Sequence, residues 1–222
     1  MQELNLIQEI IIAAPPILLA ITLHEVAHGR VALRLGDPTA RDMGRLSLNP
    51  LKHVDPVGTV LVPLVMFFAS KMLFGGGLLF GWAKPVPVDF RRLRNPRRDM
   101  ALVALAGPMC NLAMAMGWAV IFKWTAPTMD AGGGYLATPL LYMSAIGDTI
   151  NLILAVLNML PIPPLDGGRV AVAVLPRALA IPLARCERYG LLIIVALFAS
   201  GILGYVLVPA LEFLKSLIFR LV

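Results

Sequence analysis

Hydrophobic residues in this chain form long runs with very little charge, and these runs predict membrane-spanning helices. Met100–Phe122 and Tyr189–Leu211 carry no charged residue, and each exceeds the roughly 20 helical residues that cross the hydrocarbon core of a bilayer. Thr138–Leu165 is interrupted only by Asp148, and Leu4–Leu35 is apolar over most of its length. We therefore expect four spanning helices in an all-α polytopic membrane protein.

The basic residues are unevenly distributed, and their positions predict the orientation of the helices. Fifteen of the 19 Lys and Arg residues lie in three stretches, Arg30–Lys52, Lys84–Arg98 and Arg169–Arg188. Short basic loops stay on the cytoplasmic side of a membrane. We expect these three stretches to face the cytoplasm, with the N-terminus and the Lys123–Pro139 loop outside. The net charge of +6 therefore does not indicate a nucleic-acid partner.

A fifth apolar stretch, Pro56–Trp82, is interrupted by Pro63 and by the glycines at positions 75–77. The basic stretches before and after it are both expected on the cytoplasmic side, so the chain must leave and re-enter there. We interpret this stretch as a re-entrant or extended element, which needs cover from protein or a water-filled cavity. The total is then about four to six membrane segments.

Composition supports a membrane protein, because 59% of the residues are hydrophobic, 14% are charged and the mean hydropathy is +0.81. A soluble domain rarely has this composition. The two cysteines, Cys110 and Cys186, fall in separate segments. They indicate neither a disulfide framework nor a zinc site built from cysteines.

Two histidines four residues apart predict a metal site in the first helix. Positions i and i+4 share a helix face, so His24 and His28 can bind one metal ion while Glu25 reaches a water molecule on it. Such pairs also occur on exposed helices without metal. Here, however, Ile10–Leu23 carries no charge, and ionisable groups in an apolar span are usually functional.

Asp166 is the best candidate for a third metal ligand, which a catalytic zinc site requires. Three prolines at 161, 163 and 164 break the preceding helix, and Gly167 and Gly168 follow the acid. A carboxylate on a broken helix end can reach sideways to a metal. The alternative is an ordinary surface turn with a solvated aspartate, because turns favour the same residues.

Several motifs together resemble the site-2 protease family of intramembrane zinc metalloproteases, from the first helix to about Arg169. They are His24-Glu25-x-x-His28, Ala106-Gly107-Pro108-x-x-Asn111 and Asn158-x-x-Pro161-x-Pro163-x-x-Asp166-Gly167. Two further segments resemble the short bacterial branch, which lacks a peptide-binding insertion. They are Asn49-Pro50-x-x-His53-x-Asp55-Pro56 and Gly81-Trp82-Ala83-Lys84-Pro85-Val86-Pro87-Val88.

The resemblance implies one Zn²⁺ per chain, bound by His24, His28 and Asp166, with Glu25 as general base. It also implies that Asn111 and Asn158 support a ligand or donate to the oxyanion, although helix-to-helix hydrogen bonds would explain both nearly as well. His53 is either a loop residue on a cytoplasmic turn or a group close to the active site.

The prolines in Lys84-Pro85-Val86-Pro87-Val88 forbid a helix and leave an extended edge. A substrate segment can pair with such an edge as an added strand. A transmembrane substrate must unwind before its peptide bonds are accessible, and extended capture would stabilise the unwound form.

The predicted function is therefore intramembrane proteolysis, and the alternatives are a membrane metal transporter or a non-catalytic metal-binding membrane protein. The family suggests transmembrane substrates such as anti-sigma factors, membrane-tethered regulators or signal-peptide remnants. The only other partner expected is the lipid bilayer, and the oligomeric state stays open.

The sequence predicts a single domain over 1–222, with a catalytic core at about 4–169 and membrane segments at about 170–222. We expect this domain in a bacterial cytoplasmic membrane, with the active site toward the cytoplasm.

Overall fold

The computed structural model describes residues 5–62, 65, 81, 84–130 and 136–222, and all regular structure within these residues is helical. Most of Pro56–Trp82, the predicted re-entrant element, lies outside the described residues. In chain order the elements are α1 (Leu6–Arg34), α2 (Thr39–Asp42), η1 (Pro50–Lys52), η2 (Pro56–Leu61), α4 (Pro96–Asp130), α5 (Ala137–Asn158), α6 (Asp166–Val174), α7 (Arg177–Arg185), η3 (Cys186–Tyr189), α8 (Gly190–Ala199) and α9 (Ile202–Leu221).

Four of the described helices are long and apolar enough to cross a membrane. They are Ile7–Arg34, Pro96–Thr128, Ala137–Asn158 and Ile202–Leu221. The prediction of an all-α polytopic membrane protein is confirmed.

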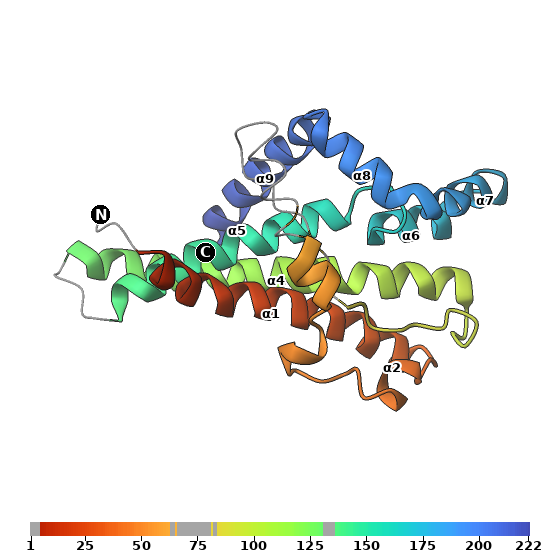
Figure 1. Ribbon diagram of the computed structural model, residues 1–222, viewed down its shortest axis with the longest axis horizontal. Coiled ribbons are helices and arrows are strands. Elements are labelled where there is room, and N and C mark those ends of the chain that lie inside the picture. Colours follow the sequence, from red (N-terminus) through yellow and green to blue (C-terminus); the bar gives the residue numbers. More distant parts are fainter. Residues whose placement is uncertain (1–4, 63–64, 66–80, 82–83, 131–135) are drawn as a thin grey trace.

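Helices α1, α4 and α5 pack lengthwise and form the centre of the molecule (Figure 1). Small residues allow this approach, because a Cβ atom on Gly147 of α5 would lie within 3.0 Å of the Trp118 ring on α4. Ala115 and Ala119 of α4 are fully buried beside Leu152 of α5. The helices are therefore close enough for polar side chains to bond across them.

The C-terminal helices differ from the prediction. Tyr189–Leu211 is not one span, because α8 ends at Ala199 and Gly201 adopts the left-handed conformation with φ 75°. A left-handed residue ends a helix, and glycine adopts it without steric cost. The spanning helix is instead α9, which packs on α5 and places Lys215 Nζ 3.8 Å from Asp148 Oδ2.

Two other segment ends also differ from the prediction made from hydropathy. α5 ends at Asn158, before the end of the apolar run Thr138–Leu165, because Pro161 follows and cannot continue a helix, as the three prolines predicted. The predicted Lys123–Pro139 loop begins later, since α4 continues through Pro127 to Asp130.

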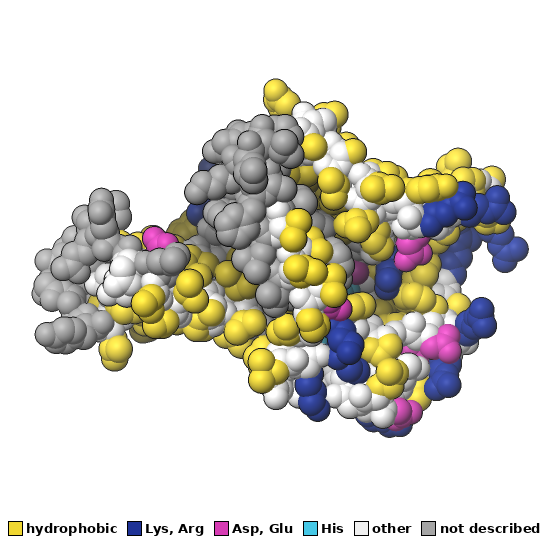
Figure 2. Space-filling model, in the orientation of Figure 1, with side chains coloured by type: hydrophobic (Ala, Val, Ile, Leu, Met, Phe, Trp, Pro, Cys, Tyr) yellow, Lys and Arg dark blue, Asp and Glu magenta, His cyan; other side chains and the backbone are white. Residues whose placement is uncertain are grey.

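Basic side chains gather at one end of the molecule. On the face shown in Figure 2, Lys and Arg cluster where α2, α6 and α7 lie, while hydrophobic side chains cover much of the rest. All three predicted basic stretches contribute residues to this end, as the chain order in Figure 1 indicates. The arrangement agrees with a common side for the three stretches.

Asp37 fixes the chain as it leaves α1 at this end. Its carboxylate accepts hydrogen bonds from the Thr39 amide (3.0 Å) and from the Asp89 amide (2.7 Å), and from the Thr39 hydroxyl. Burial raises the pKa of Asp37, but these hydrogen bonds and the charge of Arg92 outweigh burial and hold the pKa below its usual value. Asp37 thereby ties the 84–90 segment to the end of α1.

Candidate metal centre

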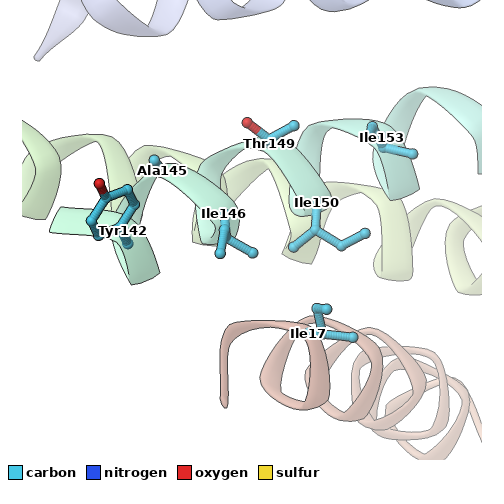
Figure 3. Close-up of a pocket in the computed structure, with 7 residues that line it drawn as sticks. All are labelled: Ile17, Tyr142, Ala145, Ile146, Thr149, Ile150 and Ile153. Atoms are coloured by element: carbon cyan, nitrogen blue, oxygen red, sulfur yellow. The ribbon is translucent and has the colours of Figure 1, made fainter. Parts of the chain in front are cut away.

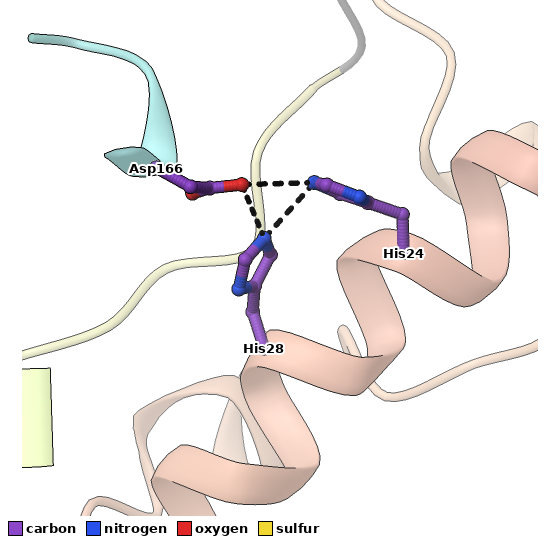
Figure 4. Close-up of side chains that lie close together, drawn as sticks. All are labelled: His24, His28 and Asp166. Atoms are coloured by element: carbon purple, nitrogen blue, oxygen red, sulfur yellow. Dashed lines mark hydrogen bonds and ion pairs between the residues drawn. The ribbon is translucent and has the colours of Figure 1, made fainter. Parts of the chain in front are cut away.

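His24 and His28 of α1 meet Asp166, the first residue of α6 (Figure 4). The two Nε2 atoms are 3.0 Å apart, and each lies 3.3 Å from Asp166 Oδ2. All three side chains are buried. The structure thus brings together the three residues that the sequence predicted as metal ligands.

The outer nitrogens of both rings donate to oxygen atoms. His28 Nδ1 donates to the Val103 carbonyl oxygen (2.7 Å), and His24 Nδ1 to Asn111 Oδ1 (2.5 Å). In a neutral imidazole the other nitrogen is then an acceptor. Both Nε2 lone pairs therefore face each other and the buried Asp166 Oδ2, which has no hydrogen-bond donor among the described residues.

This donor set fits a zinc ion. Three acceptors without protons repel one another unless a cation lies between them, and one proton would satisfy only one of the three pairs. Tetrahedral ligands at the usual distances of about 2.0–2.1 Å lie about 3.3 Å apart, which matches the separations of 3.0 and 3.3 Å. Two imidazoles and one carboxylate leave a fourth position open, as catalytic zinc sites do.

Gly107 of α4 lies directly beside the two histidine rings, where there is no room for a side chain. A Cβ atom there would come within 3.0 Å of His28 Nε2 and of His24 Cε1 and Nε2. The glycine of the Ala106-Gly107-Pro108 motif therefore lines one side of the candidate metal centre.

Two asparagine side chains, linked by hydrogen bonds, support His24 on the Nδ1 side of its ring. Asn111 accepts from His24 and donates through Nδ2 to Asn151 Oδ1 (2.8 Å) and to the Ala20 carbonyl oxygen (3.3 Å). Asn151 in turn donates to the Gly147 carbonyl oxygen. Both asparagines are fully buried. Sequence reasoning missed Asn151, although an amide in the middle of an apolar helix was the signal that could have found it.

Glu25 projects from α1 beside the cluster and is partly buried. Its Oε2 accepts a hydrogen bond from the Val86 amide at 2.7 Å. Val86 belongs to the proline-flanked segment Lys84, Pro85, Val86, Pro87 and Val88, which is neither helix nor strand. The structure therefore places the predicted general base and the predicted substrate-binding segment in direct contact.

Two other predicted residues make different contacts. Asn158 Nδ2 donates to the Leu154 carbonyl oxygen within α5. His53 is buried, with Nε2 2.8 Å from the Ser47 carbonyl oxygen, and its own carbonyl oxygen accepts from the Lys84 amide (2.9 Å). Neither contact joins the metal cluster within the described residues, so a catalytic role for either stays a prediction.

Asp166 is held in place by close backbone packing and by contacts from one arginine. A Cβ atom on Gly167 or Gly168 would overlap the backbone of the preceding 159–163 turn, so the two glycines allow α6 to begin there. At the other end of α6, Arg97 donates to the carbonyl oxygens of Ala173 (2.7 Å) and Leu175. These two contacts hold α6 against the start of α4.

An apolar groove of about 410 Å³ lies away from this cluster, between α1 and α5 (Figure 3). Ile17 lines it from α1, and Tyr142, Ala145, Ile146, Thr149, Ile150 and Ile153 from α5. It contains none of the three cluster residues. The groove is therefore not the metal centre.

Known proteins match most of the chain. The model of Peptidase family M50 matches residues 130–201, which include Asp166. “Putative zinc metalloprotease YwhC” of Bacillus subtilis is 36% identical over 206 residues, which cover 92% of this chain and 88% of that protein. The chain belongs to peptidase family M50. The resemblance to site-2 proteases is thereby confirmed, and this M50 peptidase is an intramembrane zinc metalloprotease.

Further relatives agree with this M50 assignment. Rip2 of Mycobacterium tuberculosis (strain H37Rv), which carries the same description, is 32% identical over 191 residues, covering 84% of this chain and 66% of that protein. Rip2 of Mycolicibacterium smegmatis is 28% identical over 187 residues, with the same coverage of 84% and 66%. No solved structure matches the chain significantly. The family favours the protease over the transporter and the non-catalytic protein as the function of this chain.

Proposed function

We propose that His24, His28 and Asp166 hold the single Zn²⁺ of this M50 peptidase and that Glu25 is its general base. The convergence of three lone pairs, two on imidazoles and one on a carboxylate, carries this proposal. Glu25 follows His24 directly in α1 and lies beside the same cluster.

When bound, Zn²⁺ supplies a Lewis acid that polarises the scissile carbonyl and acidifies a water molecule. Glu25 then takes a proton from the attacking water and passes it to the departing amide nitrogen. Asn111 keeps the His24 ring in the tautomer whose Nε2 is free for the metal. Both donor hydrogens of Asn111 are engaged by Asn151 and Ala20, so we assign Asn111 to His24 rather than to the oxyanion.

The substrates of this peptidase are membrane proteins, as its family implies. We propose that it cleaves them in the cytoplasmic half of the bilayer, in a bacterial cytoplasmic membrane. The basic end of the molecule supports this orientation, because Asp166 begins α6 at that end (Figures 1 and 2). Anti-sigma factors, membrane-tethered regulators and signal-peptide remnants are the proposed substrate classes.

We also propose that 1–222 acts as one domain. The core at about 4–169 contains every proposed catalytic residue, and α9 packs against α5 of that core. The segments at about 170–222 then support the core.

Two variants test the residue roles. Glu25→Gln keeps the ligands and removes the base, so purified protein should keep about one zinc per chain and lose nearly all hydrolysis of a model transmembrane substrate. Asp166→Ala should lower both zinc content and hydrolysis. Zinc loss in Glu25→Gln, or full zinc content with normal turnover in Asp166→Ala, contradicts the respective role.

The same Glu25→Gln variant separates proteolysis from metal transport. A transporter needs ligands along its path but no general base, so zinc flux into vesicles would survive this substitution. Hydrolysis of a peptide bond would not survive it.

A further inference from the structure

The Val86 amide is the donor that contacts Glu25, and it is one of few backbone N–H groups in the surrounding sequence. Pro85 and Pro87 have no N–H group, so Lys84–Val88 offers only the amides of Lys84, Val86 and Val88. The Lys84 amide donates to His53 and the Val86 amide to Glu25 Oε2. Among the described residues, the Val88 amide makes no hydrogen bond.

The backbone around Val86 is fixed from several sides. Arg45 donates to the Lys84 carbonyl oxygen (2.9 Å), and the Asp89 amide donates to Asp37 (2.7 Å). The Val86 side chain is buried at a notch in α1, where a Cβ atom on Gly29 would lie 2.8 Å from Val86 Cγ1. Because Gly29 is one helical turn after Glu25, the Val86 amide keeps a constant position relative to the base.

A glutamate side chain has three rotatable bonds and samples several rotamers unless a partner selects one. Among the described residues, the only hydrogen bond to the Glu25 carboxylate is the one from the Val86 amide. This bond holds one carboxylate oxygen and leaves the other for proton transfer. Misplacement of a catalytic group by about 1 Å is sufficient to cost about 100-fold in rate.

We propose that the backbone N–H of Val86 is a positioning group that orients Glu25 toward the metal centre. Val88, whose amide makes no such bond among the described residues, is the matched position within the same segment. This inference rests on the proposed role of Glu25 and extends it.

Single-atom backbone changes test the proposal. Replacing Val86 by its α-hydroxy acid analogue converts the amide to an ester, which removes the N–H and keeps the side chain in the Gly29 notch. We expect kcat to fall about 10- to 100-fold while zinc content stays near one per chain. The matched ester at Val88 makes the same chemical change at an amide that does not contact Glu25, so its kcat should stay near that of the wild type. Wild-type kcat in the Val86 ester overturns the proposal.

A second readout does not depend on activity. In protein labelled with ¹⁵N-valine, hydrogen exchange of the Val86 amide should accelerate about 10-fold or more in Glu25→Ala, which removes the acceptor. Glu25→Gln retains an acceptor oxygen and should keep most of the protection. Equal exchange rates in wild type and Glu25→Ala would contradict the bond itself.

The two proposals fail in different ways. If the Glu25→Gln variant still hydrolyses substrate, Glu25 is not the general base, and this conclusion does not depend on the activity of the Val86 ester. An inactive Glu25→Gln beside a fully active Val86 ester would leave the proposed function intact and remove only the positioning role.

Discussion

Gly107 shows how a single missing side chain shapes the metal centre. The two histidines beside it cannot move aside easily, because Asn111 and the Val103 carbonyl oxygen hold their rings. We predict that Gly107→Ala lowers zinc affinity by at least about 10-fold, as loss of supporting contacts around metal ligands does. Competition with a fluorescent chelator measures this affinity.

Gly117 is the matched control for Gly107. It lies on the same helix, and a Cβ atom there would meet no atom within 4 Å. Gly117→Ala should keep wild-type zinc affinity and add slightly to helix stability. Equal zinc affinity in the two alanine variants would show that Gly107 is not a wall of the site.

Asp37 gives a pH-dependent prediction. Its pKa is lowered in the folded protein from an ordinary value of 3.8, so its contribution to stability is full above that value. The contribution is lost as pH falls through the lower folded-state pKa. At pH 7, Asp37→Asn should cost about 1–3 kcal/mol in the free energy of unfolding, and the difference from wild type should shrink below about pH 4.

Denaturant unfolding in detergent at several pH values measures this effect. The control is Asp42→Asn, because Asp42 makes an exposed ion pair with its neighbour Arg41 and such pairs contribute little. A difference between Asp37→Asn and wild type that stays constant down to pH 2 would contradict the assignment.

At the residue scale, the sequence predicted which side chains form the buried cluster better than it predicted the residues that support them. His24, His28 and Asp166 follow from metal-ligand chemistry and from family motifs. Asn151 follows from no such pattern, since its role depends on the close packing of α4 and α5. Asn158, in contrast, belongs to a motif, yet among the described residues its side-chain amide bonds only to the Leu154 carbonyl oxygen of its own helix.

At the scale of elements, α6 connects Asp166, the proposed third ligand, to the rest of the fold. Arg97 at the start of α4 binds the carbonyl oxygens at the C-terminal end of α6, and Arg169 of α6 lies 5.5 Å above the Phe90 ring. We predict that Arg97→Ala releases this end, lets Asp166 shift and lowers zinc affinity about 10-fold. Chelator competition again provides the measurement.

Arg98→Ala removes the same charge one residue later, where the side chain is exposed. It should therefore keep the zinc affinity of the wild type. If both arginine variants lose zinc to the same degree, net positive charge rather than the contact with α6 is responsible.

Helix ends were predictable where proline sets them and not where glycine does. The prolines at 161, 163 and 164 correctly predicted that the helix before Asp166 breaks. Gly201 lies in a run with no charge, and its left-handed conformation depends on how α8 and α9 turn against the core. Hydropathy alone therefore merged two helices and misplaced the final span.

At the scale of the whole molecule, the orientation in the membrane is the main prediction. In a background without Cys110 and Cys186, single cysteines near Arg45, Arg94 and Arg177 should resist a membrane-impermeant thiol reagent in intact cells. A cysteine near Asp130, at the opposite end of α4, should react. Labelling near Arg94 but not near Arg45 would show instead that Pro56–Trp82 crosses the membrane fully.

The contact between Asp148 and Lys215 has a consequence for the order in which the protein assembles. Asp148 enters the bilayer with α5, more than fifty residues before Lys215 is synthesised, and an aspartate in hydrocarbon costs about 3 kcal/mol. Until α9 is made, Asp148 lacks its ion-pair partner. Docking of α9 then brings Lys215 Nζ to 3.8 Å from Asp148 Oδ2. A ribosome stalled before α9 would therefore hold a chain whose Asp148 still lacks this ion-pair partner.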